Sequence, residues 1–155
     1  MYLVDTNIII YYLEGERAAV SFLSEIRGKM AISCITWMET LSYPFSKDEE
    51  QIVRTFLQEF RLIEIAVPVM ELSVGLRRNK KIKLPDAIIA ASAIHNELIL
   101  VTRNTKDFKG TATKTIDPFA MARLEPPDTP SVYAGKPLSI EDMDQAIEAE
   151  AGKRR

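Results

Sequence analysis

The 155-residue chain is 46% hydrophobic and 27% charged, which is the composition of one ordinary globular domain. It has no run near the roughly 18 apolar residues of a membrane span and no secretion signal at its N-terminus, so we expect a cytoplasmic protein with no membrane partner. Its net charge of −2 gives no general sign of nucleic-acid binding, and the single cysteine, Cys34, excludes an intramolecular disulfide and a cysteine cluster for zinc.

Apolar runs typical of buried strands alternate with helical patterns along most of the chain. The expected strands are residues 2–6, 30–33, 61–65 and 98–102. The expected helices are residues 8–14, 17–27, 35–43, 47–60, 69–79 and 85–96. This alternation predicts an α/β fold, a three-layer α/β/α sandwich with a mostly parallel central sheet.

Several residues in these elements have an expected environment. Cys34 is expected to be a small buried residue. Trp37 and Tyr43 lie near Glu39 and are able to stack an RNA base, but we expect both in the core. His95, the only histidine, is expected at the surface or as a helix cap.

Acidic side chains occur at the points where a parallel sheet places its ligand site. Asp5 ends the first strand, Glu39 lies in the helix after the second, and Asp86 opens the helix over residues 85–96. Asn104 and Asp107 follow the fourth strand. Because ligands bind beyond the carboxyl ends of parallel strands, where the strand order reverses, all five are candidates for one pocket.

A cluster of carboxylates needs a proton or a cation. Two carboxylates about 4 Å apart repel by roughly 4 kcal/mol at an effective dielectric of 20. Oxygen ligands without histidine or cysteine favour Mg²⁺ or Mn²⁺ over zinc, and such an ion can activate water against a phosphodiester. Each acid also has a structural explanation: Asp5 or Asn7 as a helix cap, Asp86 as a partner of its helix dipole, and Glu39 as a solvated side chain.

The segments "YLVDTNIII", "SCITWMETL", "LPDAIIAASAI" and "LVTRNTKDF" together resemble the PIN-domain ribonucleases, and specifically the VapC toxins of toxin–antitoxin pairs. The resemblance covers about residues 1–123 and implies Mg²⁺-dependent endonucleolytic cleavage of RNA, a homodimer and inhibition by a cognate antitoxin. It implies that Asp5, Glu39 and Asp86 bind the metal and are catalytic, with Asn104 or Asp107 as the fourth position. The supporting polar residues would be Thr6, Asn7, Ser33 and Thr102.

The basic loop expected at residues 77–83, "RRNKKIK", has two explanations. Such a charge run is often only solvated surface. The resemblance instead implies contacts with the RNA backbone from this segment and from one residue after the fourth strand. The candidates are Arg77, Arg78, Lys80, Lys81, Lys83 and Arg103.

The composition changes after residue 123. Residues 124–155 hold seven acidic and four basic residues, a net charge of −3. Residues 124–138 are rich in proline and predict a linker, and residues 139–155 predict a short helix with a basic end. Its apolar stripe is Ile140, Met143 and Ile147, and its basic residues are Lys153, Arg154 and Arg155.

This C-terminal segment is similar to the C-terminal segments of AbrB-type antitoxins, which implies a tethered inhibitor. In that hypothesis the apolar stripe docks in a groove, and a basic residue pairs with Asp5, Glu39 and Asp86 and displaces the metal. A family-specific extension and a disordered end are the alternatives. For the whole chain, the alternative to a nuclease is a catalytically silent PIN-like module that binds an antitoxin or RNA.

Overall fold

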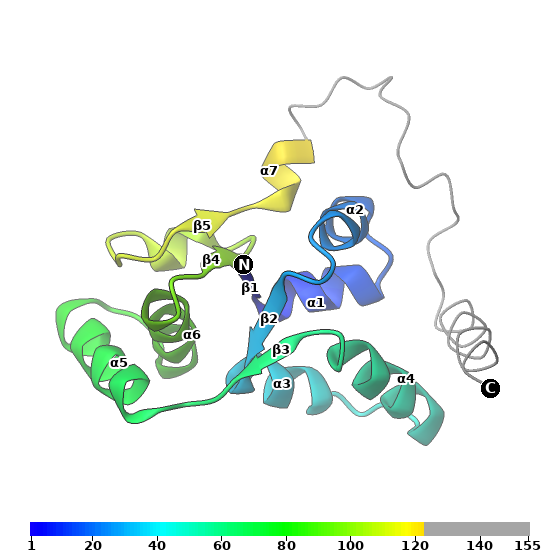
Figure 1. Ribbon diagram of the computed structural model, residues 1–155, viewed down its shortest axis with the longest axis horizontal. Helices are drawn as coiled ribbons and strands as arrows, with labels where there is room; N and C mark the ends of the chain where they lie inside the picture. Colours follow the sequence, from blue (N-terminus) through cyan, green and yellow to red (C-terminus); the bar gives the residue numbers. More distant parts are fainter. Residues whose placement is uncertain (123–155) are drawn as a thin grey trace.

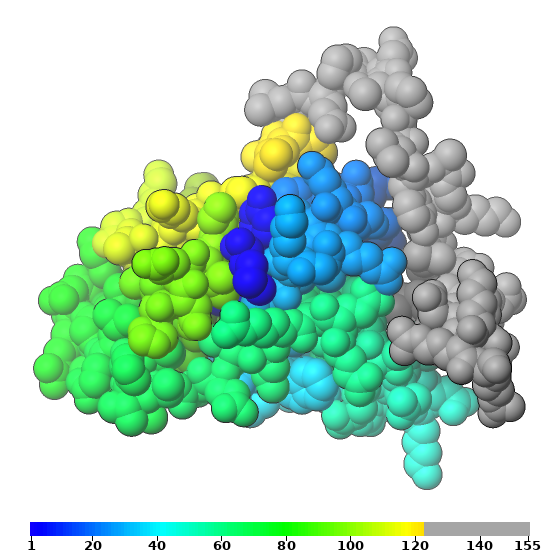
Figure 2. All heavy atoms as spheres, in the orientation of Figure 1, coloured from blue at the N-terminus to red at the C-terminus, as the bar shows by residue number. Residues whose placement is uncertain are grey.

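The computed structural model of the protein describes residues 1–122, and these form the three-layer α/β/α sandwich expected from the sequence (Figure 1). Five strands pair in the order β3-β2-β1-β4-β5, and all four pairs are parallel. The strands are β1 (Tyr2–Val4), β2 (Met30–Ser33), β3 (Arg61–Ile63), β4 (Ile99–Val101) and β5 (Thr115–Ile116). In Figure 2 the first residues, in dark blue, lie between light-blue and yellow-green segments, as the central position of β1 requires.

Seven helices of the described range surround this sheet. They are α1 (Thr6–Leu13), α2 (Arg17–Glu25), α3 (Cys34–Leu41), α4 (Lys47–Leu57), α5 (Val67–Asn79), α6 (Leu84–His95) and α7 (Pro118–Ala122). None of the helices within residues 1–122 has the length and apolar character needed to cross a membrane.

Neighbouring residues of the inner strands β1, β2 and β4 supply the two separate cores on either side of the sheet. Leu3 and Leu100 are buried against α5 and α6, whereas Val4 and Val101 are buried against α1, α2 and α4. This follows from the pleat, because successive side chains of a strand point to opposite faces. Both faces of β1 and β4 are therefore covered, and only their ends remain available for a site.

The structure corrects several details of the sequence prediction. Strand β5, helix α7 and the 3-10 turn Thr105–Phe108 were not predicted. Helix α1 begins two residues earlier than expected, because Asp5 accepts the backbone N–H of Thr6 and caps it. Cys34 is only half-buried, since it begins α3 at the end of the sheet, and not fully buried as expected.

The three other expected environments are also settled. Tyr43 lies beyond the end of α3 with 65% of its surface exposed, so its expected core position is wrong. Trp37 is half-buried and packs against the core, and His95 is exposed at the end of α6, as predicted. The expected linker over residues 124–138 and the expected helix over 139–155 lie outside the described residues.

Candidate active site

Asp5 is the buried centre of a polar group at the carboxyl ends of β1 and β4. Its backbone N–H continues the sheet by donating to the carbonyl of Val101, and only 6% of the residue is exposed. One carboxylate oxygen accepts the Thr6 N–H at 2.8 Å. The other accepts the Thr102 hydroxyl at 2.8 Å and the Asn7 amide at 2.9 Å. These three donors fix the direction of the carboxylate.

Burial raises the pKa of Asp5 above its ordinary value, because the charged form loses its hydration. The hydrogen bonds from Thr102 and Thr6 oppose this rise, and the charges of Asp86 and Glu39 add to it. Asp5, Glu39 and Asp86 therefore lie close enough to influence one another, although they come from three separate parts of the chain.

Glu39 reaches this site from α3. The Thr6 hydroxyl donates a short hydrogen bond to its carboxylate, which joins the first turn of α1 to the second turn of α3. The Glu39 side chain is otherwise exposed. Ser33 fixes the start of α3 by accepting the Thr36 N–H at 3.1 Å, so its described contacts are those of a helix cap and involve no carboxylate.

Asp86 stands in the first turn of α6, where it is half-buried. Desolvation raises its pKa, and the charges of Asp107 and Glu39 raise it further. Lys83, the residue before α6, lowers the pKa of Asp86 and is therefore the nearby cation that partly offsets these acids. A carboxylate at a helix N-terminus is ordinarily stabilised, so the net rise shows that burial, with the charges of nearby acids adding to it, outweighs the favourable position of Asp86 at the start of α6.

The loop after β4 supplies the last two candidates. The Asn104 backbone N–H donates to the Thr102 hydroxyl oxygen at 3.1 Å, while its side chain is exposed. Asp107 lies in the following 3-10 turn, is exposed, and acts on Asp86 through its charge. Both therefore lie on the β4 side of the site.

The side chains of this site do not form a complete metal-binding cluster as they stand. Within residues 1–122, no three histidine, cysteine, aspartate or glutamate side chains lie close enough together to hold a metal ion as they stand. The donor set nevertheless has the chemistry of an Mg²⁺ or Mn²⁺ site, since it consists of carboxylate, amide and hydroxyl oxygens. Burial is the largest cause of the raised pKa values of Asp5 and Asp86, and the neighbouring carboxylates raise both further; a cation would offset that second contribution.

The basic candidates divide into two groups. Arg77 and Arg78 lie in the last turn of α5, where basic side chains complement the helix dipole. The first part of the expected basic loop is therefore the end of a helix. The remaining lysines of the segment are exposed in the connection to α6: Lys80, Lys81 and Lys83. Arg103 is separate from all of them and lies beside the β4 end of the site.

Arg103 also has contacts that the sequence did not reveal. Its guanidinium lies 5.0 Å from the centre of the Tyr11 ring and 4.5 Å from the centre of the Phe119 ring. In the sequence, the only sign of these ring contacts is that Tyr11 comes one helical turn after Asn7. Phe119 could not be linked to them, because it lies in helix α7, which was not predicted.

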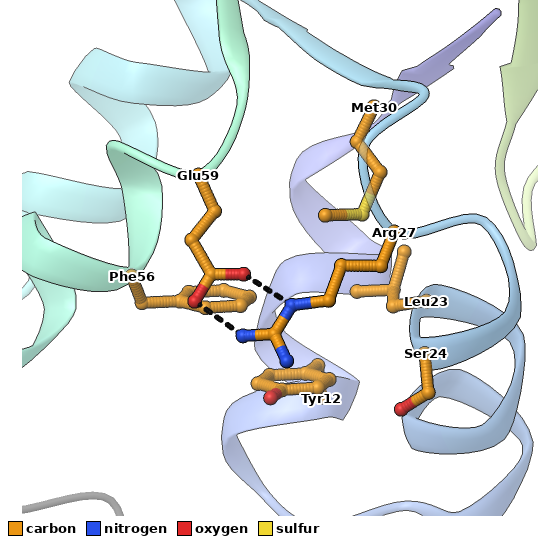
Figure 3. Close-up of a pocket in the computed structure, with 7 residues that line it drawn as sticks. All are labelled: Tyr12, Leu23, Ser24, Arg27, Met30, Phe56 and Glu59. Atoms are coloured by element: carbon orange, nitrogen blue, oxygen red, sulfur yellow. Dashed lines mark hydrogen bonds and ion pairs between the residues drawn. The ribbon is translucent and has the colours of Figure 1, made fainter. Parts of the chain in front are cut away.

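A hollow elsewhere on the molecule is not part of this site (Figure 3). Arg27 and Glu59 form a two-pronged ion pair there, with nitrogen–oxygen distances of 2.9 and 2.8 Å. The Tyr12 and Phe56 rings stack beneath it with centres 4.5 Å apart. Arg27 precedes β2 and Glu59 precedes β3, so the hollow lies at the amino ends of the strands, opposite the carboxylates.

Solved structures with this fold are known. The chain is 43% identical to a chain of a toxin–antitoxin complex from Klebsiella pneumoniae, with a TM-score of 0.70 over 76% of this chain and 98% of that one. It is 25% identical to a chain of VapBC2 from Rickettsia felis, solved with a DNA fragment from the promoter, with a TM-score of 0.64 over 75% and 98%. A protein from Pyrobaculum aerophilum, PAE2754, shares the fold at 20% identity, with a TM-score of 0.57 over 79% and 87%.

The family assignment rests on the sequence as well as on the fold. No protein with a curated description matches the chain at a significant level. The PIN domain, in contrast, matches residues 2–114, a range that contains every carboxylate of the site. The chain therefore belongs to the PIN domain family.

Proposed function

We propose that the protein is a VapC-like toxin, an Mg²⁺- or Mn²⁺-dependent endoribonuclease that hydrolyses RNA phosphodiester bonds. The observation that carries the proposal is an electrostatic one: the charges of Asp86 and Glu39 act on Asp5, and those of Asp107 and Glu39 act on Asp86. The chain is similar to a chain of a toxin–antitoxin complex, and the similarity covers 98% of that other chain. This similarity supports the toxin part of the proposal.

In this proposal Asp5, Glu39 and Asp86 hold the metal, with Asn104 or Asp107 as a further oxygen ligand. The bound ion lowers the pKa of a water molecule and offsets charge on the phosphate. The chain's own contribution is orientation: Thr102 and Asn7 hold the Asp5 carboxylate, and Thr6 holds that of Glu39. Such outer contacts are worth about 10- to 100-fold in metal affinity or activity.

Removing divalent ions tests the proposal. The purified full chain is expected to cleave single-stranded RNA with Mg²⁺ or Mn²⁺, to lose that activity in excess EDTA, and to regain it when the metal is restored. A protein that binds RNA but cleaves none with either metal, both as the full chain and without residues 128–155, would instead support the catalytically silent module.

An antitoxin is the proposed protein partner, because similar chains are found in toxin–antitoxin complexes.

A homodimer is also proposed. On α5, Val67, Met70 and Val74 are exposed at spacings of three and four residues, which gives that helix an apolar stripe on its outer side. Such a stripe is typical of a surface that is covered in an assembly.

The C-terminal segment is proposed as a tethered inhibitor, on the sequence similarity alone. A tether raises the local concentration of the inhibitor to about millimolar, so a weak segment still occupies the site. The acids give Lys153, Arg154 or Arg155 an electrostatic target, and Ile140, Met143 and Ile147 supply an apolar face.

Deleting residues 128–155 is expected to raise the rate of RNA cleavage at a fixed Mg²⁺ concentration. Exchanging Lys153, Arg154 and Arg155 together for glutamine in the full chain serves as the matched variant, and it should raise the rate as well. Equal rates for all three proteins would contradict a tethered inhibitor and leave the nuclease proposal standing.

A further inference from the structure

Arg103 is held at both of its ends. Its backbone N–H donates to the Asn7 side-chain oxygen at 3.3 Å, and the same Asn7 side chain donates to Asp5 and to Thr102. At the far end, the guanidinium lies over the Tyr11 and Phe119 rings. The side chain therefore has a fixed place relative to Asp5, although it is exposed.

The rings of Tyr11 and Phe119 contact each other as well as the guanidinium, and together they are called the aromatic seat of Arg103. Their centres are 4.9 Å apart and their planes meet at 62°, an edge-to-face arrangement. Tyr11 projects from α1 one helical turn after Asn7, and Phe119 projects from α7, whose start is capped by the Asp117 carboxylate at 2.9 Å. The seat thus joins three segments that are far apart in the sequence.

Contacts through the face of a guanidinium leave its edge donors available. Within residues 1–122, the Arg103 side chain forms no ion pair with a carboxylate. The N–H groups along the edge of the guanidinium fit the paired oxygens of a phosphate. The cation–π contacts also reduce the entropy lost when such an anion binds, since the side chain is already in position.

The position of Arg103 indicates which anion it would meet. Tyr11 and Phe119 pack with the core on the α1 side of the sheet, whereas Lys83 precedes α6 on the other side. The carboxylates thus have a cation on each flank. A polyanionic strand that approaches the acids is repelled by them, and fixed cations on both sides offset this repulsion for the phosphates that flank the reacting one.

We propose that Tyr11 and Phe119 are positioning residues that hold Arg103 in place to bind an RNA phosphate next to the one that is cleaved. This inference rests on the proposed ribonuclease function. It distinguishes Arg103 from Arg77 and Arg78, which have no such seat and lie at the end of α5.

The test compares Arg103→Ala, Phe119→Leu and Phe119→Tyr in the full chain. Binding of a fluorescent single-stranded RNA is measured in EDTA, where no metal-dependent cleavage occurs, and kcat and KM are measured with Mg²⁺. Arg103→Ala is expected to weaken RNA binding and raise KM about tenfold, and Phe119→Leu about fivefold, with kcat nearly unchanged. Phe119→Tyr keeps the ring and should behave like the natural protein.

Two further measurements separate positioning from a general loss of structure. In the Arg103→Ala background, Phe119→Leu should have no additional effect on RNA binding, because it acts through the missing guanidinium. Arg103→Ala and Phe119→Leu should each reduce the slope of log affinity against log salt by about 0.7, the loss of one phosphate contact on a single strand. Arg17→Gln, which removes an exposed charge at the start of α2, serves as the control for a lost surface charge.

The inference is overturned if Phe119→Leu weakens binding equally with and without Arg103, or if Arg103→Ala leaves RNA affinity unchanged. Failure of the ribonuclease proposal has a different signature. In that case the protein cleaves no RNA with Mg²⁺, with or without residues 128–155, whereas the binding comparison in EDTA still reports on Arg103 and Phe119.

Discussion

Asp5→Asn is expected to reduce metal-dependent RNA cleavage by at least about a hundredfold while the chain stays folded. Changes to outer contacts of a metal site cost about 10- to 100-fold, and the loss of a direct carboxylate ligand should cost no less. Asparagine has nearly the same shape, and its oxygen can still accept the Thr6 N–H that starts α1. The measurement is the initial rate of cleavage at saturating Mg²⁺, together with circular dichroism to verify folding.

Asp48→Asn is the matched control for this substitution. Asp48 is an exposed carboxylate in the first turn of α4 and has no part in the site. The control should cleave RNA at the natural rate. If Asp5→Asn retains full activity under the same conditions, Asp5 is not a metal ligand, and the carboxylate site loses its central member.

Asp86→Asn is expected to change activity and stability in opposite directions. Cleavage should again fall by at least about a hundredfold, because a proposed ligand is lost. Thermal stability without metal should rise at neutral pH by about 2 °C, a small value because Asp86 is half exposed. The pKa of Asp86 is raised in the folded state by burial and by Asp107 and Glu39, so its charge opposes folding.

The sign of this effect gives it a defined pH dependence. With a folded-state pKa above the ordinary value of 3.8, the folded state holds the proton of Asp86 more tightly than the unfolded state does. The resulting stabilisation is complete below pH 3.8 and is lost as the pH rises through the raised pKa. The difference in Tm between Asp86→Asn and the natural protein should therefore be small near pH 3.8 and grow with increasing pH.

Added Mg²⁺ supplies the complementary measurement. It should raise the Tm of the natural protein at neutral pH and narrow its difference from Asp86→Asn, since a bound cation offsets the charge that asparagine removes. Asp48→Asn should leave the response of the Tm to Mg²⁺ unchanged. A natural protein that is more stable than Asp86→Asn in metal-free buffer at neutral pH would contradict this account.

The sequence was sufficient for the elements whose patterns are strong. The strand β4 is a continuous apolar run, and α6 combines an early proline and aspartate with small apolar residues, so both were predicted to within two residues. The positions of Asp5 and Asp86 followed from the geometry of parallel sheets. Their closeness is a tertiary property, which the strand-end rule anticipates only in outline.

The missed features depend on packing between distant segments. Strand β5 has two residues, too few to show a period, and it exists because it pairs with β4. Helix α7 has five residues and is held by Phe119 against Tyr11 and Arg103. No local pattern identifies such a contact, and for the same reason the hydrogen bond from Thr6 to Glu39 could not be assigned from the sequence.

The two ends of the sheet hold different groups of side chains. The ion pair of Arg27 and Glu59 and the stacked rings of Tyr12 and Phe56 brace the amino ends of the strands. The acids occupy the carboxyl ends and share no side chain with that bracing. Substitutions of exposed residues in the loop after β4 can therefore change the chemistry of the carboxylate end while the contacts at the opposite end of the sheet stay intact.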